Sequence, residues 1–144
     1  MAPAERYYKW ALYDRDPIAR WSRGRATLLG DAAHAMLPHI GQGACMAIED
    51  GYALGAVLAQ MPDDLSEALR HYERLRLPRT RQAVLESRAR GNEMHLTSKW
   101  AQLKRNVKMA WQHRIGGDKT GIKLGAFYAY DVEAVTRLPQ RMPT

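Results

Sequence analysis

The sequence predicts an α/β fold that is locally mostly helical. Two observations predict the β part: an aromatic-rich run over residues 6–13 and a short apolar run over residues 25–29, both typical of strands. A third observation predicts the helical part, because apolar residues recur at helical spacing through much of residues 43–112. With 144 residues, the chain has the length of one domain.

The two predicted strands differ in kind. Residues 6–13 are expected to form a half-exposed aromatic strand that Asp14-Arg15-Asp16-Pro17 ends. Residues 25–29 are a short apolar run between Gly24 and Gly30. The second run is therefore expected to be a buried parallel strand, covered on both faces. Two strands make a marginal sheet at best, so we expect the neighbouring strands to lie upstream and this sequence to be the C-terminal part of a larger protein.

A predicted loop over residues 31–42 leads into the first helix, which begins at Gly43. This helix is apolar around most of its surface, so it is expected to be buried, and Met61-Pro62 ends it. The next helix is expected to begin where Asp64 and Glu67 form the pattern of a capping box.

Three further signals divide the rest of the chain. Pro78 is expected to kink or break the second helix, which then resumes to about Arg90, and Gly91-Asn92 is a stop signal. A third helix follows, ending at Gly116-Gly117. It carries four large apolar residues on one side: Trp100, Leu103, Val107 and Trp111. The tail beyond it shows no clear period.

Composition narrows the class of protein. The net charge is +7 and the pI is near 9.8, with arginines concentrated between Arg70 and Arg90. Glutamates interleave this stretch, which has a single aromatic residue, so a solvated helix surface is favoured over a face that binds nucleic acid. The one cysteine, Cys45, cannot form an internal disulfide, is expected to be a small buried thiol, and fits a reducing cytoplasm. No run approaches the roughly 18 apolar residues of a membrane span.

The most specific pattern is Gly30-Asp31-Ala32-Ala33-His34, followed by Pro38 and by Gly41-Gln42-Gly43 at the start of a helix. The Asp31 carboxylate can accept hydrogen bonds from hydroxyl groups, and the helix start offers unpaired N–H groups and the positive end of the helix dipole. This pattern predicts a site for a polar, partly anionic cofactor.

Two other groups in this region carry side chains that often take part in chemistry. His34 and His39 lie five residues apart without a third ligand nearby, so no metal site is predicted. Glu49 and Asp50 stand early in an apolar helix, where they either pair with an arginine or face the edge of the site; the sequence leaves both options open.

The run Gly24-Arg25-Ala26-Thr27-Leu28-Leu29-Gly30-Asp31-Ala32-Ala33-His34, with Pro38, Gln42-Gly43 and Glu49-Asp50, resembles the second FAD-binding segment of the group A flavoprotein monooxygenases. The branch that contains 3-hydroxybenzoate 6-hydroxylase and salicylate hydroxylase is the most similar. The resemblance implies a Rossmann-like FAD-binding fold and a soluble, cytoplasmic enzyme that is a homodimer as a full-length protein. It also implies NADH or NADPH as co-substrate and the hydroxylation of a phenolic aromatic acid with dioxygen.

The resemblance assigns roles to individual residues. Asp31 would bind the ribityl hydroxyls, Pro38 would pack beside the isoalloxazine, and Gln42 and His39 would lie near the substrate side as catalytic candidates. Backbone N–H groups would face the flavin from the residues at the start of the helix: Gly41, Gln42, Gly43 and Ala44.

The resemblance also divides the chain. Residues 1–17 would end the sheet of the substrate domain, residues 18–63 would be the second FAD-binding segment, and residues 64–144 a C-terminal helical region. The family's Gly-x-Gly-x-x-Gly and middle Asp-Gly motifs are absent, so we expect residues 1–144 alone to hold FAD weakly and to lack hydroxylase activity. The alternative is a basic helical module that binds nucleic acid or a protein.

Overall fold

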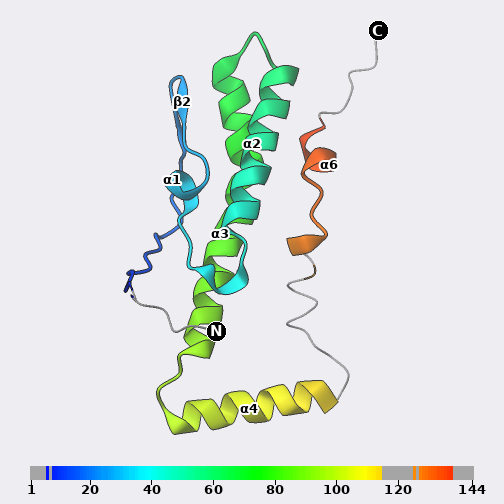
Figure 1. Cartoon of the computed structure of the whole chain (residues 1–144). Helices are drawn as coiled ribbons and strands as arrows, with labels where there is room; N and C mark the ends of the chain where they lie inside the picture. The colour runs from blue at the N-terminus through cyan, green and yellow to red at the C-terminus, as the bar shows by residue number, and fades with distance from the viewer. Residues whose placement is uncertain (1–5, 7, 115–124, 126, 138–144) are drawn as a thin grey trace.

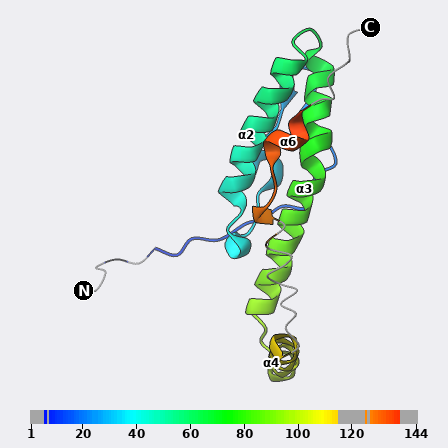
Figure 2. The ribbon, with the colours of Figure 1, turned by 90° about the vertical axis from the view of Figure 1, so that its right-hand side faces the viewer.

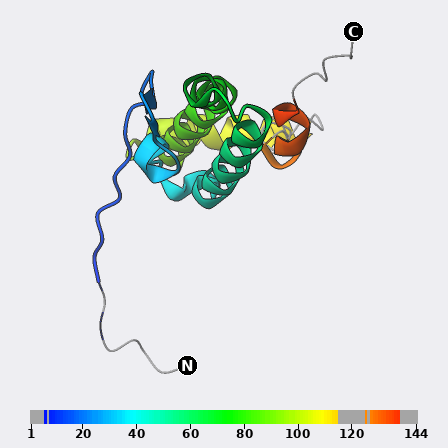
Figure 3. The same cartoon turned by 90° about the horizontal axis from the view of Figure 1, so that it is seen from above.

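Two long helices form the centre of the molecule. The structure, a computed structural model, describes residues 6, 8–114, 125 and 127–137. Helix α2 (Gly43–Gln60) and helix α3 (Leu65–Met94) run antiparallel and side by side, joined by a short turn (Figures 1 and 2). A hairpin and the short helix α1 (Asp31–His34) lie on one side of this pair, and helix α6 (Val132–Thr136) lies on the other (Figure 3).

The apolar run at residues 25–29 is not a buried parallel strand. It contributes a two-residue strand, β2 (Ala26–Thr27), which pairs antiparallel with β1 (Ser22–Arg23), so that Ser22 lies opposite Thr27. Gly24, with φ +59°, makes the turn between them. Within the described residues no other strand pairs with this hairpin, so the run folds back on its own neighbour instead of entering a wider sheet.

The strand expected over residues 6–13 is also absent from the part of that run that the structure describes. Residues 8–17 form neither strand nor helix, and their aromatic side chains are exposed, Trp10 by 79%. Polar contacts hold the end of this segment: Asp14 and Asp16 accept hydrogen bonds from Arg88 at 2.7 and 2.8 Å. The backbone N–H of Arg15 donates to the Ala35 carbonyl at 3.3 Å.

Helix α2 has the bounds predicted for the helix that begins at Gly43, but it is only partly buried. Met46, Asp50, Ala53 and Val57 form its buried face, whereas Ile48 is 73% exposed. The apolar surface of α2 is therefore wider than the face that α3 and the neighbouring segments cover.

Helix α3 begins as predicted and ends later than predicted. The Asp64 carboxylate accepts the N–H of Glu67 at 2.9 Å, which caps the helix start. Pro78 does not break the helix, and α3 also runs past Gly91 to Met94. Both halves of α3 bury residues against the rest of the molecule, and this packing outweighs the local cost of a proline and a glycine.

Helices α4 and α6 lie beyond α3 in the described part of the chain. Helix α4 (Lys99–Arg114) has the predicted apolar stripe, whose four large side chains are all exposed, and it extends across the end of α3 (Figure 1). Its predicted stop at Gly116-Gly117 lies outside the described residues. Helix α6 was not predicted; the Asp131 carboxylate caps it by accepting the N–H of Ala134 at 3.1 Å.

Among the described residues, two clusters of buried side chains form much of the core. One contains Trp21, Ala33, Ala53 and Tyr72. The other contains Ile40, Met46, Ala83 and Phe127. No helix in the described ranges is both long and apolar enough to cross a membrane.

Candidate functional site

The turn before Asp31 comes close to helix α2. Gly30 has φ +59°, and a Cβ atom at this position would lie 3.3 Å from the Cβ of Ala47. The Gly30 N–H donates a hydrogen bond to Oδ2 of Asp50 at 3.0 Å. A glycine is needed here both for the backbone conformation and for the close approach, and Asp31 is thereby placed at the exposed start of α1.

The start of α2 lies close to this turn and lacks a side-chain cap. Gly41 has φ +65°, and Gln42, the N-cap residue, makes no capping hydrogen bond with its side chain. The first N–H groups of this 18-residue helix are thus left without a side-chain partner at the N-cap, where the helix dipole favours a negative charge.

A hollow of about 540 Å³ lies between these two segments. Five of the six residues predicted to bind the cofactor line it. The residues that line the hollow are Asp31, Met36, Leu37, Pro38, Gly41, Gly43, Ala44 and Ala47. The hollow is bordered by one carboxylate, by small residues and by the open helix start, and it is otherwise apolar.

The two catalytic candidates are placed differently from these five. Gln42 is only 3% exposed and is not among the lining residues of the hollow. His39 lies in the 3-10 helix η1 (Pro38–Ile40), and its ring packs on α3 against Gly91 and His95. Both residues are in segments that border the hollow, but neither side chain lines it.

A buried network of charges fixes the turn and α2 to α3. Arg76 donates to Asp50 at 2.7 Å and lies 2.8 Å from Glu49, and Arg79 donates two hydrogen bonds to Glu49, at 2.6 and 2.7 Å. His34 donates from Nε2 to Asp50 at 2.6 Å. Glu49 and Asp50 therefore pair with arginines, which was one of the two options that the sequence left open.

Sequence reasoning missed Arg76, although a signal was present. It was grouped with an arginine-rich surface, yet it is fully buried. Arg76 lies four residues after Tyr72 and four before Thr80, and therefore on the same helix face as these two buried residues. An arginine in the register of an apolar stripe, with two acids on the preceding helix, indicates a buried ion pair.

The pKa values of this pair reflect its partners. Burial alone would raise the pKa of Asp50, but hydrogen bonds from His34, Arg76 and Gly30, with the charge of Arg76, outweigh burial and lower it. Burial alone would lower the pKa of Arg76, but Asp50 and Glu49 raise it. Both groups are thus held in their charged forms.

This network predicts a loss of stability in acid. Because the pKa of Asp50 is below its ordinary value of 3.8 in the folded chain, its contribution is complete above about pH 5 and is lost as the pH falls through the lowered pKa. We expect the free energy of unfolding, measured by urea titration from pH 6 to pH 3, to fall toward low pH. In Asp50→Asn, the slope of the free energy of unfolding against pH should be smaller by up to about 1.4 kcal/mol per pH unit.

The matched control for this experiment is Glu67→Gln, because Glu67 pairs with Arg70 and Arg74 at the surface. It should keep most of the parent's pH dependence. If Asp50→Asn keeps all of it, the assignment of the acid transition to Asp50 is wrong.

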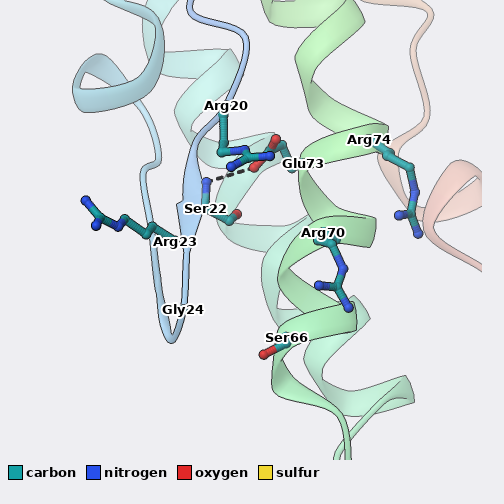
Figure 4. Close-up of a pocket in the computed structure, with 8 residues that line it drawn as sticks. All are labelled: Arg20, Ser22, Arg23, Gly24, Ser66, Arg70, Glu73 and Arg74. Atoms are coloured by element: carbon teal, nitrogen blue, oxygen red, sulfur yellow. Dashed lines mark hydrogen bonds between the residues drawn. The ribbon is translucent and has the colours of Figure 1, made fainter.

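A second hollow, of about 430 Å³, is lined by four arginines, but their side chains do not converge on one point (Figure 4). Glu73 accepts the backbone N–H groups of Trp21 and Ser22 at 3.0 and 2.8 Å, which ties the hairpin to α3. Arg23 and Arg70 point in different directions, and Arg70 and Arg74 already pair with Glu67. The hollow is therefore a weak basis for the alternative of a basic binding module.

One smaller expectation, the burial of Cys45, is wrong. Cys45 was expected to be buried and is exposed, because it lies on the side of α2 that α3 does not cover. Within the described residues, no group of three or more histidine, cysteine, aspartate or glutamate side chains is placed to hold a metal ion.

Comparison with known proteins gives the family. A family model described as an FAD binding domain matches residues 4–87, which is more than half of the chain. The chain belongs to this family. The open helix start and the hollow beside Asp31 thus lie within the matched part of an FAD binding domain.

Three proteins that resemble this chain are named as monooxygenases or hydroxylases. The chain is 47% identical over 112 residues to a 3-amino-4-hydroxybenzoate 2-monooxygenase of Streptomyces platensis, covering 78% of this chain and 28% of the relative. It is 49% identical over 87 residues to a 3-hydroxybenzoate 6-hydroxylase of Polaromonas naphthalenivorans, covering 60% of this chain and 22% of that protein. A salicylate hydroxylase structure in complex with substrate matches with a TM-score of 0.62 at 29% identity, covering 88% of this chain and 30% of that one. The chain therefore spans less than a third of the length of each.

Proposed function

We propose that this chain is the flavin-holding part of an NAD(P)H-dependent monooxygenase that hydroxylates a phenolic aromatic acid such as 3-hydroxybenzoate or salicylate. The observation that carries the proposal is the hollow between Asp31 and the open start of α2, which is lined by five residues named for the cofactor from the sequence. Membership of the FAD binding domain family supports the same cofactor.

The residues present fit the flavin end of FAD. Asp31 is exposed at the rim, where its carboxylate would accept hydrogen bonds from ribityl hydroxyls. Pro38 would pack against the ring system, and the backbone of Gly41, Gly43 and Ala44 would approach it closely. The uncapped α2 start would stabilise a negative charge on the reduced ring by roughly 0.3–1 kcal/mol. Bound FAD would accept a hydride from NADH or NADPH and activate dioxygen for transfer of one oxygen atom to the substrate.

The finer assignments follow the same proposal. We place Gln42 and His39 at the substrate side, as members of the two segments that border the hollow. Residues 1–17 would belong to the substrate domain, residues 18–63 to a Rossmann-like FAD domain, and residues 64–144 to its C-terminal helical region. The complete enzyme would be a cytoplasmic homodimer. The basic-module alternative is less well supported, because Arg76 and Arg79 are engaged with Glu49 and Asp50.

A chimera tests the proposal directly. The 112 residues of this chain that match the Streptomyces 3-amino-4-hydroxybenzoate 2-monooxygenase, at 47% identity, would replace the corresponding segment of that enzyme. We expect the purified chimera to retain FAD and to consume NADH or NADPH in the presence of an aromatic acid. A chimera that folds but is colourless after gel filtration would rule out the proposed cofactor role.

Gln42 provides a test of the substrate side. In the chimera, Gln42→Ala should reduce the coupling of NAD(P)H oxidation to hydroxylated product and increase peroxide release more than it lowers thermal stability. Gly55→Ala is the control, since Gly55 faces open space on the same helix. Equal coupling in Gln42→Ala and in the parent would show that Gln42 does not act on the reaction.

A further inference from the structure

One face of α3 contacts the loop that borders the hollow. Ser87, Gly91 and His95 follow one another at four-residue intervals, so they share a side of the helix and its C-cap. The Ser87 hydroxyl donates to the carbonyl of Leu37. The ring of His95 lies edge-on to the ring of His39, with 5.7 Å between the ring centroids. The C-terminal half of α3 thus holds both ends of the short segment 37–39.

Gly91 lies directly under the His39 ring. A Cβ atom at position 91 would lie 2.5 Å from Nε2 of His39 and closer still to Cδ2, well inside van der Waals contact. Any side chain at this position is therefore incompatible with the observed place of the ring. A glycine inside a helix costs about 1 kcal/mol relative to alanine, so a buried one has a packing reason. Gly51 and Gly55 in α2 differ, because a Cβ atom at either position would have nothing within 4 Å of it.

We propose that Gly91 is a positioning residue for the candidate flavin site. Its missing side chain leaves a seat on α3 for the His39 ring, and the seated ring fixes the loop Pro38–Gly41. Pro38 and Gly41 line the hollow, so the seat sets the position of that wall. His39 then serves as the anchor of the wall. The packing of the His39 ring on Gly91 does not depend on the proposed function. Only the identity of the ligand that the wall contacts, FAD, rests on the proposed function.

The first experiment observes the wall without a ligand. In the 144-residue chain, backbone amide signals of Gly41 and Gly43 are measured by NMR for Gly91→Ala, for His39→Ala and for the double variant. We expect each single variant to shift these signals. The double variant should lie no further from the parent than His39→Ala alone, because Gly91→Ala acts by displacing the ring that His39→Ala removes. Gly55→Ala should leave the signals in place. Unmoved signals in Gly91→Ala, or additive shifts in the double variant, would overturn the proposal.

The second experiment asks whether the wall matters to FAD. In the chimera described above, Gly91→Ala should raise the Kd for FAD several-fold relative to Gly55→Ala, with no further increase when His39→Ala is added. A Gly91→Ala chimera that binds FAD as tightly as its parent would overturn the claim that the seat aligns the cofactor wall. A chimera that fails to hold FAD even with Gly91 intact would instead refute the proposed function, and the amide signals would still decide the seat.

Discussion

Replacing Arg76 with methionine is expected to lower the free energy of unfolding by about 3–5 kcal/mol, the cost of removing one partner from a buried ion pair. Arg76 is fully buried and contacts Asp50, Glu49, the Met46 carbonyl and the Tyr130 hydroxyl. Without it, the Asp50 carboxylate would stay in the core with hydrogen bonds but no neighbouring guanidinium. Urea titration at pH 7 measures the change, and a variant that is unfolded without urea also meets the expectation.

Arg70→Met is the matched control, since Arg70 is on the same helix but 59% exposed and paired only at the surface. Its effect should stay within about 1 kcal/mol. The double variant Arg76→Met/Asp50→Leu should recover part of the loss, because it removes both charges together. If Arg76→Met costs no more than Arg70→Met, the buried network does not hold the two long helices together.

Asp31→Ala in the chimera is expected to weaken FAD binding by about tenfold or more, the scale of one charge-assisted hydrogen bond. Asp31 is exposed at the rim of the hollow, and the turn that presents it is held by Gly30 and Asp50. The substitution should therefore change affinity with little effect on folding. Fluorescence titration of the apo chimera with FAD gives the Kd.

Asp63→Ala serves as the control for Asp31→Ala, because Asp63 is an exposed carboxylate in the turn between α2 and α3. It removes one negative charge from the chain at a place away from the hollow. A flavin content after gel filtration that is the same in Asp31→Ala, Asp63→Ala and the parent would remove Asp31 from the cofactor site.

The helices were predictable from the sequence because their signals are local. The apolar spacing after Gly43 and the cap at Asp64 both act within a few residues, and both were confirmed. The end of α3 was not predictable, since Pro78 and Gly91 are tolerated only through contacts with segments distant in sequence. Gly91 is such a case, because His39 from another loop fills the space beside it.

The prediction of the two strands was wrong for a related reason, because a strand forms only where it has a partner strand. Residues 25–29 are apolar enough for a buried strand, but within the described residues they meet only Ser22 and Arg23. Five of the cofactor candidates line one hollow, but their roles, like those of Gln42 and His39, stay predictions. Burial of Arg76 depends on acids in another helix, which composition alone does not reveal.

The position of Trp21 has a consequence for the tryptophan fluorescence of this chain. Trp21 is buried between the hairpin and α3, with its ring 5.8 Å from that of Tyr72, whereas Trp10, Trp100 and Trp111 are exposed. A water-soluble quencher will reach the three exposed indoles and leave the fourth. The emission that survives comes from the seam where the hairpin meets α3, so a single native fluorophore reports whether that seam is closed.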